Sequence, residues 1–257
     1  MEFIELKNKF SEMTLIQGCE IDCEYEFKSG KKVVLHVVAL YPHTSLYLNV
    51  IRDMLGKYTR TNREPYIRKL LDNLRELKIE LDSYEKLLEK YDYLGRPVLA
   101  YELKSKGYAH SVNEAMDLYL GDFGQKLALK DLPKKNSKKA RSLDEVVDVI
   151  KQSKGMAILA HLYYYKLTKD EERELLEYFS SKTGKMGGME VNYRAYNQEQ
   201  RKELKEYSKE FDLFPSSASD YHGYYETDSL NNQFEGQKLY LDLLNRYFDY
   251  YEELLCF

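Results

Sequence analysis

The second half of the chain alternates between short apolar runs and segments that begin with helix-capping residues. The apolar runs predict strands at 156–160, 189–193 and 213–215. Helix starts are expected after Ser142, Thr168 and Asn197, each followed three residues later by Glu or Gln. Strands that alternate with helices in this way run parallel, so the pattern predicts an α/β fold with helices outside a barrel or an open sheet.

The first half of the chain predicts a hairpin followed by a helical block. Two strand-like segments, Cys19–Phe27 and Lys32–Leu40, flank a polar turn that contains Gly30. Helical periodicity follows, and a basic, loop-like stretch separates it from the second half. We therefore predict a discontinuous barrel domain at 1–44 and 142–257, and an all-helical insertion with a basic linker at 45–141.

Composition bounds the class of protein. The chain has 257 residues, 43% of them hydrophobic and 32% charged, with a formal net charge of -4. It contains no apolar run of the roughly 20 residues that a membrane span needs, and its first residues lack the pattern of a signal peptide. We expect a cytoplasmic protein that does not bind membranes. The three cysteines have no zinc-knuckle spacing, and their odd number argues against a disulfide framework.

Several of the apolar runs end in a residue that can bind a metal. Glu20, His36 and His161 end three such runs, and Asp220 and His222 follow a fourth. Imidazoles and carboxylates are ligands for Zn²⁺, Mn²⁺ and Fe²⁺. Taken alone, each residue also fits a structural role: the aspartate can cap a turn, and a histidine can be a hydrogen-bonded core residue. The prediction of a metal site therefore depends on their convergence.

Other polar and aromatic residues leave two interpretations open. Glu190 is either a site acid or a charged residue that leaves a strand for water. The tyrosines at 163–165 either stack on a base or cover the mouth of the barrel. His43 and His110 are expected to be solvated surface residues.

Seven motifs occur in an order that resembles the PHP (polymerase and histidinol phosphatase) domain superfamily. They are Gly18-Cys19-Glu20-Ile21, Leu35-His36-Val37-Val38, Gly95-Arg96-Pro97, Tyr119-Leu120-Gly121, Ile158-Leu159-Ala160-His161, Met189-Glu190-Val191 and Ser219-Asp220-Tyr221-His222-Gly223. The helical insertion resembles the branch of metal-dependent phosphoesterases that cleave phosphate esters of nucleotides or short RNA. The resemblance implies a distorted (β/α)7-type barrel with divalent metals at the C-terminal ends of its strands.

The resemblance also implies roles for individual residues. Glu20, His36, His161, Asp220 and His222 would bind Mn, Zn, Fe or Mg ions. Asp220 and His222 would also act in catalysis, by hydrolysis through a metal-bound hydroxide. Arg96 would bind the phosphate of a small phosphorylated substrate or of short RNA or DNA.

The chain departs from the family pattern at its start. Family members begin with a strand that ends in His-x-His, whereas this sequence has five histidines and no His-x-His. Val98 replaces a histidine, and Leu162 replaces a proline. We therefore expect a barrel that lacks its first strands, partial metal occupancy and impaired hydrolysis, as in a truncated form of a phosphoesterase. The alternative is a degenerate, non-catalytic PHP-like binding protein; an accessory module of a DNA polymerase fits less well.

The missing strands have a structural consequence. They would leave the edge of the strand at 15–20 unpaired, and such an edge tends to pair with another chain. We expect a second copy in a homodimer, the C-terminal helix or a rearrangement to cover this edge.

Overall fold

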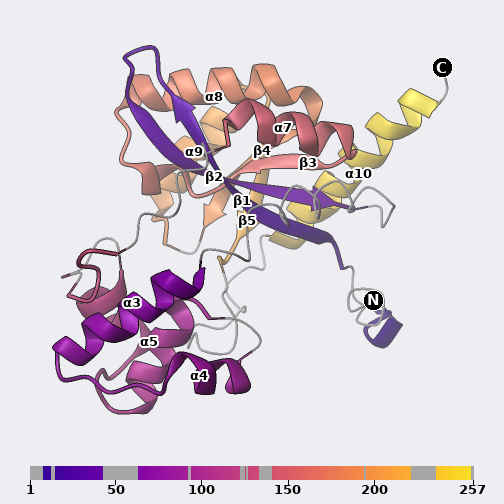
Figure 1. Ribbon diagram of the computed structural model, residues 1–257. Helices are drawn as coiled ribbons and strands as arrows, with labels where there is room; N and C mark the ends of the chain where they lie inside the picture. The colour runs from indigo at the N-terminus through magenta and orange to yellow at the C-terminus, as the bar shows by residue number, and fades with distance from the viewer. Residues whose placement is uncertain are drawn as a thin grey trace. The chain divides into compact units, whose positions relative to one another are not determined.

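The computed structural model describes residues 8–12, 15–42, 63–91, 94–121, 125, 127–132, 141–193, 195–220 and 236–255. These residues fall into two compact units, a sheet unit and a helical unit, which are described separately (Figure 1). The molecule is of the mixed α/β class, as the sequence predicts. No described helix has the length and apolar character needed to cross a membrane.

The sheet unit is built on five strands in the order β1-β2-β3-β4-β5. The strands are β1 (Gln17–Glu26), β2 (Lys32–Tyr41), β3 (Met156–Leu159), β4 (Gly187–Tyr193) and β5 (Phe214–Ala218). β1 and β2 form the expected antiparallel hairpin, β2 pairs antiparallel with β3, and β3, β4 and β5 run parallel. Among the described residues the sheet has two edges, β1 and β5, so its closure into a barrel stays a prediction.

Helices cover both faces of this sheet. They are α7 (Leu143–Gln152), α8 (Lys169–Thr183), α9 (Gln198–Glu210) and α10 (Gly236–Leu255) (Figure 1). α8 lies on the face that carries Tyr25, whose ring centroid is 5.1 Å from that of Tyr178. On the other face, Leu243 and Tyr247 of α10 pack with Ile158 and with Val38. The two faces of the sheet therefore pack against different helices.

The local signals of the sequence are realised where they were expected. Ser142, Thr168 and Asn197 each form a capping box at the start of α7, α8 and α9. In each box the side chain accepts a backbone N–H of the first turn, and the Glu or Gln side chain accepts the N–H of the capping residue. The hairpin turn contains Gly30 at φ 81°, a conformation that favours glycine.

The hairpin places a row of acids on one face of its outer strand. Glu20, Asp22, Glu24 and Glu26 alternate along β1 with inward residues such as Ile21. Lys32 of β2 lies 3.0 Å from Glu24 and 3.2 Å from Glu26. On the outer edge, the backbone N–H of Glu24 donates to the carbonyl of Arg141 at 2.7 Å. Coverage of the rest of this edge by a second copy stays a prediction.

The helical unit contains α3 (Arg63–Glu76), α4 (Tyr84–Lys90), α5 (Arg96–Ser105) and α6 (Val112–Ala115), which continues as the π-helical turn η1 (Met116–Leu120). Leucines at 70, 74, 87, 99 and 103 are fully buried in its core. All of its described elements are helical, in agreement with the periodicity of the sequence. The boundaries predicted above for the insertion stay a prediction.

The register of β2 can be tested with two neighbouring residues. Leu35 is fully buried, whereas Val34 is 55% exposed. Leu35→Ala should lower the free energy of unfolding by about 2 to 5 kcal/mol because it leaves a cavity in the core. Val34→Ala should cost less than about 1 kcal/mol. Urea unfolding of both variants measures the difference; equal losses would mean that β2 is shifted by one residue, which would also turn His36 to the other face.

Candidate metal site

Two residues of the site come from the hairpin. In the β1–β2 register, Asp22 lies opposite His36 and Glu20 lies opposite Val38. Glu20 is therefore the diagonal neighbour of His36 on the same face of the sheet. Glu20 Oε1 lies 2.5 Å from His36 Nδ1, and Asp22 Oδ1 lies 3.4 Å from His36 Nε2. The imidazole of His36 thus lies between two carboxylates.

The third residue, His161, follows the end of β3. All four residues of this strand are buried, and Ala160 after it is fully buried. His161 then adopts φ 28° and ψ 59°, an uncommon conformation for a residue other than glycine. Its backbone N–H donates to Glu190 Oε2 at 2.8 Å. This turn directs the chain into a 3-10 turn, η2 (Leu162–Tyr165), while the imidazole stays 6% exposed.

Glu20, His36 and His161 form a compact triad. Glu20 Oε1 lies 3.5 Å from His161 Nε2, and His36 Nδ1 lies 3.2 Å from His161 Nε2. One ligand atom from each of the three residues lies within 4.8 Å of the other two. The structure therefore brings together three of the five residues for which the sequence predicts metal binding.

The charges of the triad support one another. Burial alone would raise the pKa of Glu20, but the hydrogen bonds of His161 and His36 outweigh it and lower that pKa to about 2. The hydrogen bond to Glu20 raises the pKa of His36, although burial opposes this shift. In the metal-free protein the site therefore holds a carboxylate next to an imidazole that readily binds a proton.

Glu190 is buried, so the interpretation that it leaves its strand for water is wrong. It is 5% exposed, and burial raises the pKa of its carboxyl to about 7, with the hydrogen bond from the His161 backbone opposing the shift. The pairing of β4 with β5 shifts between Glu190 and Asn192. Such irregularities change the direction of side chains and are frequent next to functional sites.

The remaining predicted site residues are only partly described. Asp220 follows β5 at φ 52°, and the hydroxyl of Tyr193 donates to its Oδ2 at 2.8 Å. It does not belong to the triad. Arg96 lies in the helical unit, where its Nη1 donates to the Leu120 carbonyl at 3.1 Å. His222 and His43 lie outside the described residues.

The three tyrosines of the turn at 163–165 have different environments. Tyr163 donates its hydroxyl to Glu203 Oε2 at 2.5 Å. Tyr164 is 52% exposed, and its ring centroid lies 5.2 Å from that of His161. The hydroxyl of Tyr165 contacts the backbone of both His36 and Ala160. Only Tyr164 therefore presents much of its ring to solvent.

Two neighbours of the triad have contacts that the sequence analysis did not predict. Asp22 could have been found, because it lies two residues after Glu20 on a predicted strand and so shares its face. Tyr165 gave no such signal, since its contacts depend on how β2 and β3 pair.

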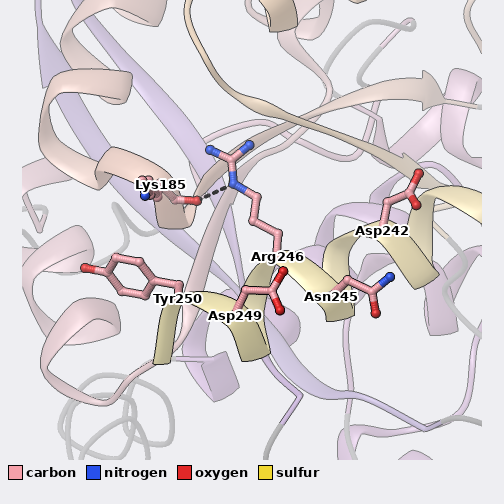
Figure 2. A pocket seen from close by; sticks show the side chains of 6 residues that line it. All are labelled: Lys185, Asp242, Asn245, Arg246, Asp249 and Tyr250. Carbon is pink, nitrogen blue, oxygen red and sulfur yellow. Dashed lines mark hydrogen bonds between the residues drawn. The ribbon is translucent and has the colours of Figure 1, made fainter. Parts of the chain in front are cut away.

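A separate hollow lies along α10, lined by Lys185, Asp242, Asn245, Arg246, Asp249 and Tyr250 (Figure 2). Arg246 Nε donates to the Lys185 carbonyl at 2.7 Å, and its Nη2 donates to the Asp212 carbonyl at 3.4 Å. This arginine thus ties α10 to the segments before β4 and β5. None of the lining residues belongs to the triad.

Two solved structures have a similar overall fold. A proposed metal-dependent phosphoesterase from Bifidobacterium adolescentis superposes with a TM-score of 0.71 at 21% identity, over 95% of this chain and 80% of that chain. An amidohydrolase from Chromobacterium violaceum, solved with bound sulfate and no metal, gives 0.65 at 18% identity, over 95% and 82%. This chain has their fold. No protein-family model and no curated protein matches it.

These neighbours agree with the coarser part of the resemblance, an α/β fold shared with a proposed metal-dependent phosphoesterase. The donor set of the triad fits a divalent metal, because two imidazole nitrogens and one carboxylate oxygen are a common set in Zn²⁺, Mn²⁺ and Fe²⁺ sites. His161 Nδ1 is also buried without a hydrogen-bond partner among the described residues. This nitrogen is not the one that faces the triad, because the contacts with Glu20 and His36 are made by Nε2.

Metal binding at the triad should depend on pH. The raised pKa of His36 means that an incoming ion must displace its proton, whereas Glu20, with its lowered pKa, stays ionised. The affinity for Mn²⁺ should therefore fall severalfold from pH 6.5 to 5.5, with a limit of about tenfold for the displacement of one proton. Calorimetry in two buffers of different ionisation enthalpy should show proton release on binding. An affinity that stays constant over this range would contradict the assignment of His36.

The buried carboxyl of Glu190 should make the protein less stable as the pH rises. A carboxyl whose pKa is raised in the folded state costs stability as pH rises from its unfolded value, near 4.5, through about 7. In metal-free protein, Glu190→Gln should therefore raise the free energy of unfolding by on the order of 1 to 3 kcal/mol at pH 8 and by little at pH 4.5.

Glu203→Gln is the matched control for this measurement. Partial burial alone would raise the pKa of Glu203, but hydrogen bonds of Lys169 and Tyr163 lower it. This control should lose stability at pH 8, and urea unfolding at both pH values compares the two variants. A loss in both variants at pH 8 would show that Glu190 is stabilised as an ion.

Proposed function

We propose that the chain is a metal-dependent hydrolase that cleaves phosphate esters of nucleotides or short oligonucleotides. The observation that carries this proposal is the position of Glu20. One of its carboxylate oxygens, Oε1, lies within 3.5 Å of a nitrogen of His36 and of a nitrogen of His161. The likeness to a proposed metal-dependent phosphoesterase supports the reaction class.

The residues of the site would have different roles. Glu20, His36 and His161 would hold the ion, and Asp220 and His222 would complete the ligand set and act in proton transfer. A divalent ion held there lowers the pKa of a bound water and polarises a phosphoryl oxygen. Glu190 would fix the backbone of His161 through its hydrogen bond.

Two further residues would contact the substrate. Arg96 would bind a phosphate with its planar guanidinium. Tyr164, 52% exposed and next to His161, offers a ring on which a base can stack. These contacts favour a small phosphorylated substrate or the end of a short nucleic acid.

A second candidate is a non-catalytic protein of the same fold that binds a phosphate ligand. One observation favours it: the described residues hold a single group of three metal-binding side chains, enough for one ion. Phosphoester hydrolysis by this class of site often uses two ions. Under this candidate the triad is a relic of an ancestral centre.

Metal content and turnover separate these candidates. Protein purified without chelator should contain stoichiometric metal and hydrolyse a generic phosphoester with added Mn²⁺. His161→Ala should lose the metal and at least about 100-fold of the rate, since it removes a ligand. His110→Ala, in an exposed position of the helical unit, should change neither. Bound metal without turnover would favour the binding protein, and protein that takes up no Mn²⁺ would refute the proposed hydrolase.

A further inference from the structure

The hydrogen-bond ladder between β2 and β3 is interrupted at the pair formed by His36 and Ala160, the residue before His161. Val37 lies opposite Leu159, so the next pair in the same register is His36 and Ala160. The N–H of Ala160 donates to the carbonyl of His36 at 3.1 Å. An antiparallel pair of this kind normally exchanges a second bond in the other direction.

The second bond runs through the hydroxyl of Tyr165. The N–H of His36 donates to this hydroxyl at 2.9 Å, and the hydroxyl donates to the carbonyl of Ala160 at 3.0 Å. The carbonyl of His36 is a poorer acceptor for it, at 3.5 Å. One oxygen atom is thus inserted into the ladder, with its single proton and a lone pair both in use.

The inserted hydroxyl lies beside the triad. β3 ends at Leu159, and His161 leaves the sheet in its left-handed conformation two residues later. Its Nε2 then lies 3.2 Å from Nδ1 of His36. A second direct bond, from the N–H of His36 to the carbonyl of Ala160, would draw the two backbones closer just before the side chains of His36 and His161 converge on Glu20.

The turn at 162–165 holds the hydroxyl in place. Leu162 is 1% exposed, so its buried side chain anchors the start of the turn. The N–H of Tyr164 donates to the carbonyl of His161 at 2.9 Å.

We propose that Tyr165 is a positioning residue whose hydroxyl, inserted between the backbones of His36 and Ala160, sets the separation of the two imidazoles that face Glu20. The geometric part of this proposal does not depend on any ion. Its consequence for metal affinity rests on the proposed function.

Tyr165→Phe tests this role, with Tyr163→Phe as the matched control from the same turn. In crystal structures of the metal-free proteins, Tyr165→Phe should change the distance between His36 Nδ1 and His161 Nε2 from the 3.2 Å found here. Amide exchange at His36 should become faster, and Mn²⁺ affinity should fall about 10-fold or more, as for other groups that orient a ligand. Tyr163→Phe should leave all three quantities unchanged, although it also loses a hydroxyl hydrogen bond.

The outcomes distinguish this inference from the proposed function. An unchanged distance in Tyr165→Phe, or an equal change in Tyr163→Phe, would overturn the positioning role. If the unaltered protein binds no Mn²⁺, the proposed function fails, while the distance and the amide exchange still decide the inference. If Tyr165→Phe does not fold, proton NMR of the unaltered protein decides it: a slowly exchanging Tyr165 hydroxyl proton close to the His36 amide proton is expected, and its absence would contradict the inserted hydroxyl.

Discussion

The antiparallel pairing of β2 with β3 is the constraint on which the rest of the sheet unit depends. It joins a local hairpin to a parallel sheet that is contributed by the other half of the chain. Without it, Glu20 and His36 would belong to one element and His161 to another, with nothing to bring them together. Because side chains alternate along a strand, a shift of this pairing by one residue would also separate the triad.

The site contains features that cost free energy and that the fold must support. His161 occupies a sparsely populated backbone conformation, and Glu190 is an acid with almost no exposure to water. The two features stabilise each other, since the carboxyl of Glu190 accepts the N–H that this conformation presents. Such costs concentrate at functional sites, because a scaffold selected only for stability has no reason to keep them.

The sequence predicted the features that depend on residues close together in the chain, and missed those that depend on how distant strands pair. The capping boxes and the hairpin turn at Gly30 depend on residues three or four apart, and the structure confirms them. The hairpin alone places Glu20 and His36 on neighbouring strands, and the structure shows that their side chains are in contact. The burial of Glu190 and the hydroxyl of Tyr165 within the ladder depend on strands that are far apart in the sequence, which periodicity does not align.

The row of acids on β1 has a consequence for the order of events at the site. Glu20 and Asp22 flank His36, and Glu24 and Glu26 continue the same face. Lys32 pairs with Glu24 and Glu26, so Glu20 and Asp22 dominate the charge beside His36. These carboxylates attract cations and repel phosphate, an effect that weakens with salt. Under the proposed function, an anionic substrate would therefore meet a favourable field only where a cation is already bound.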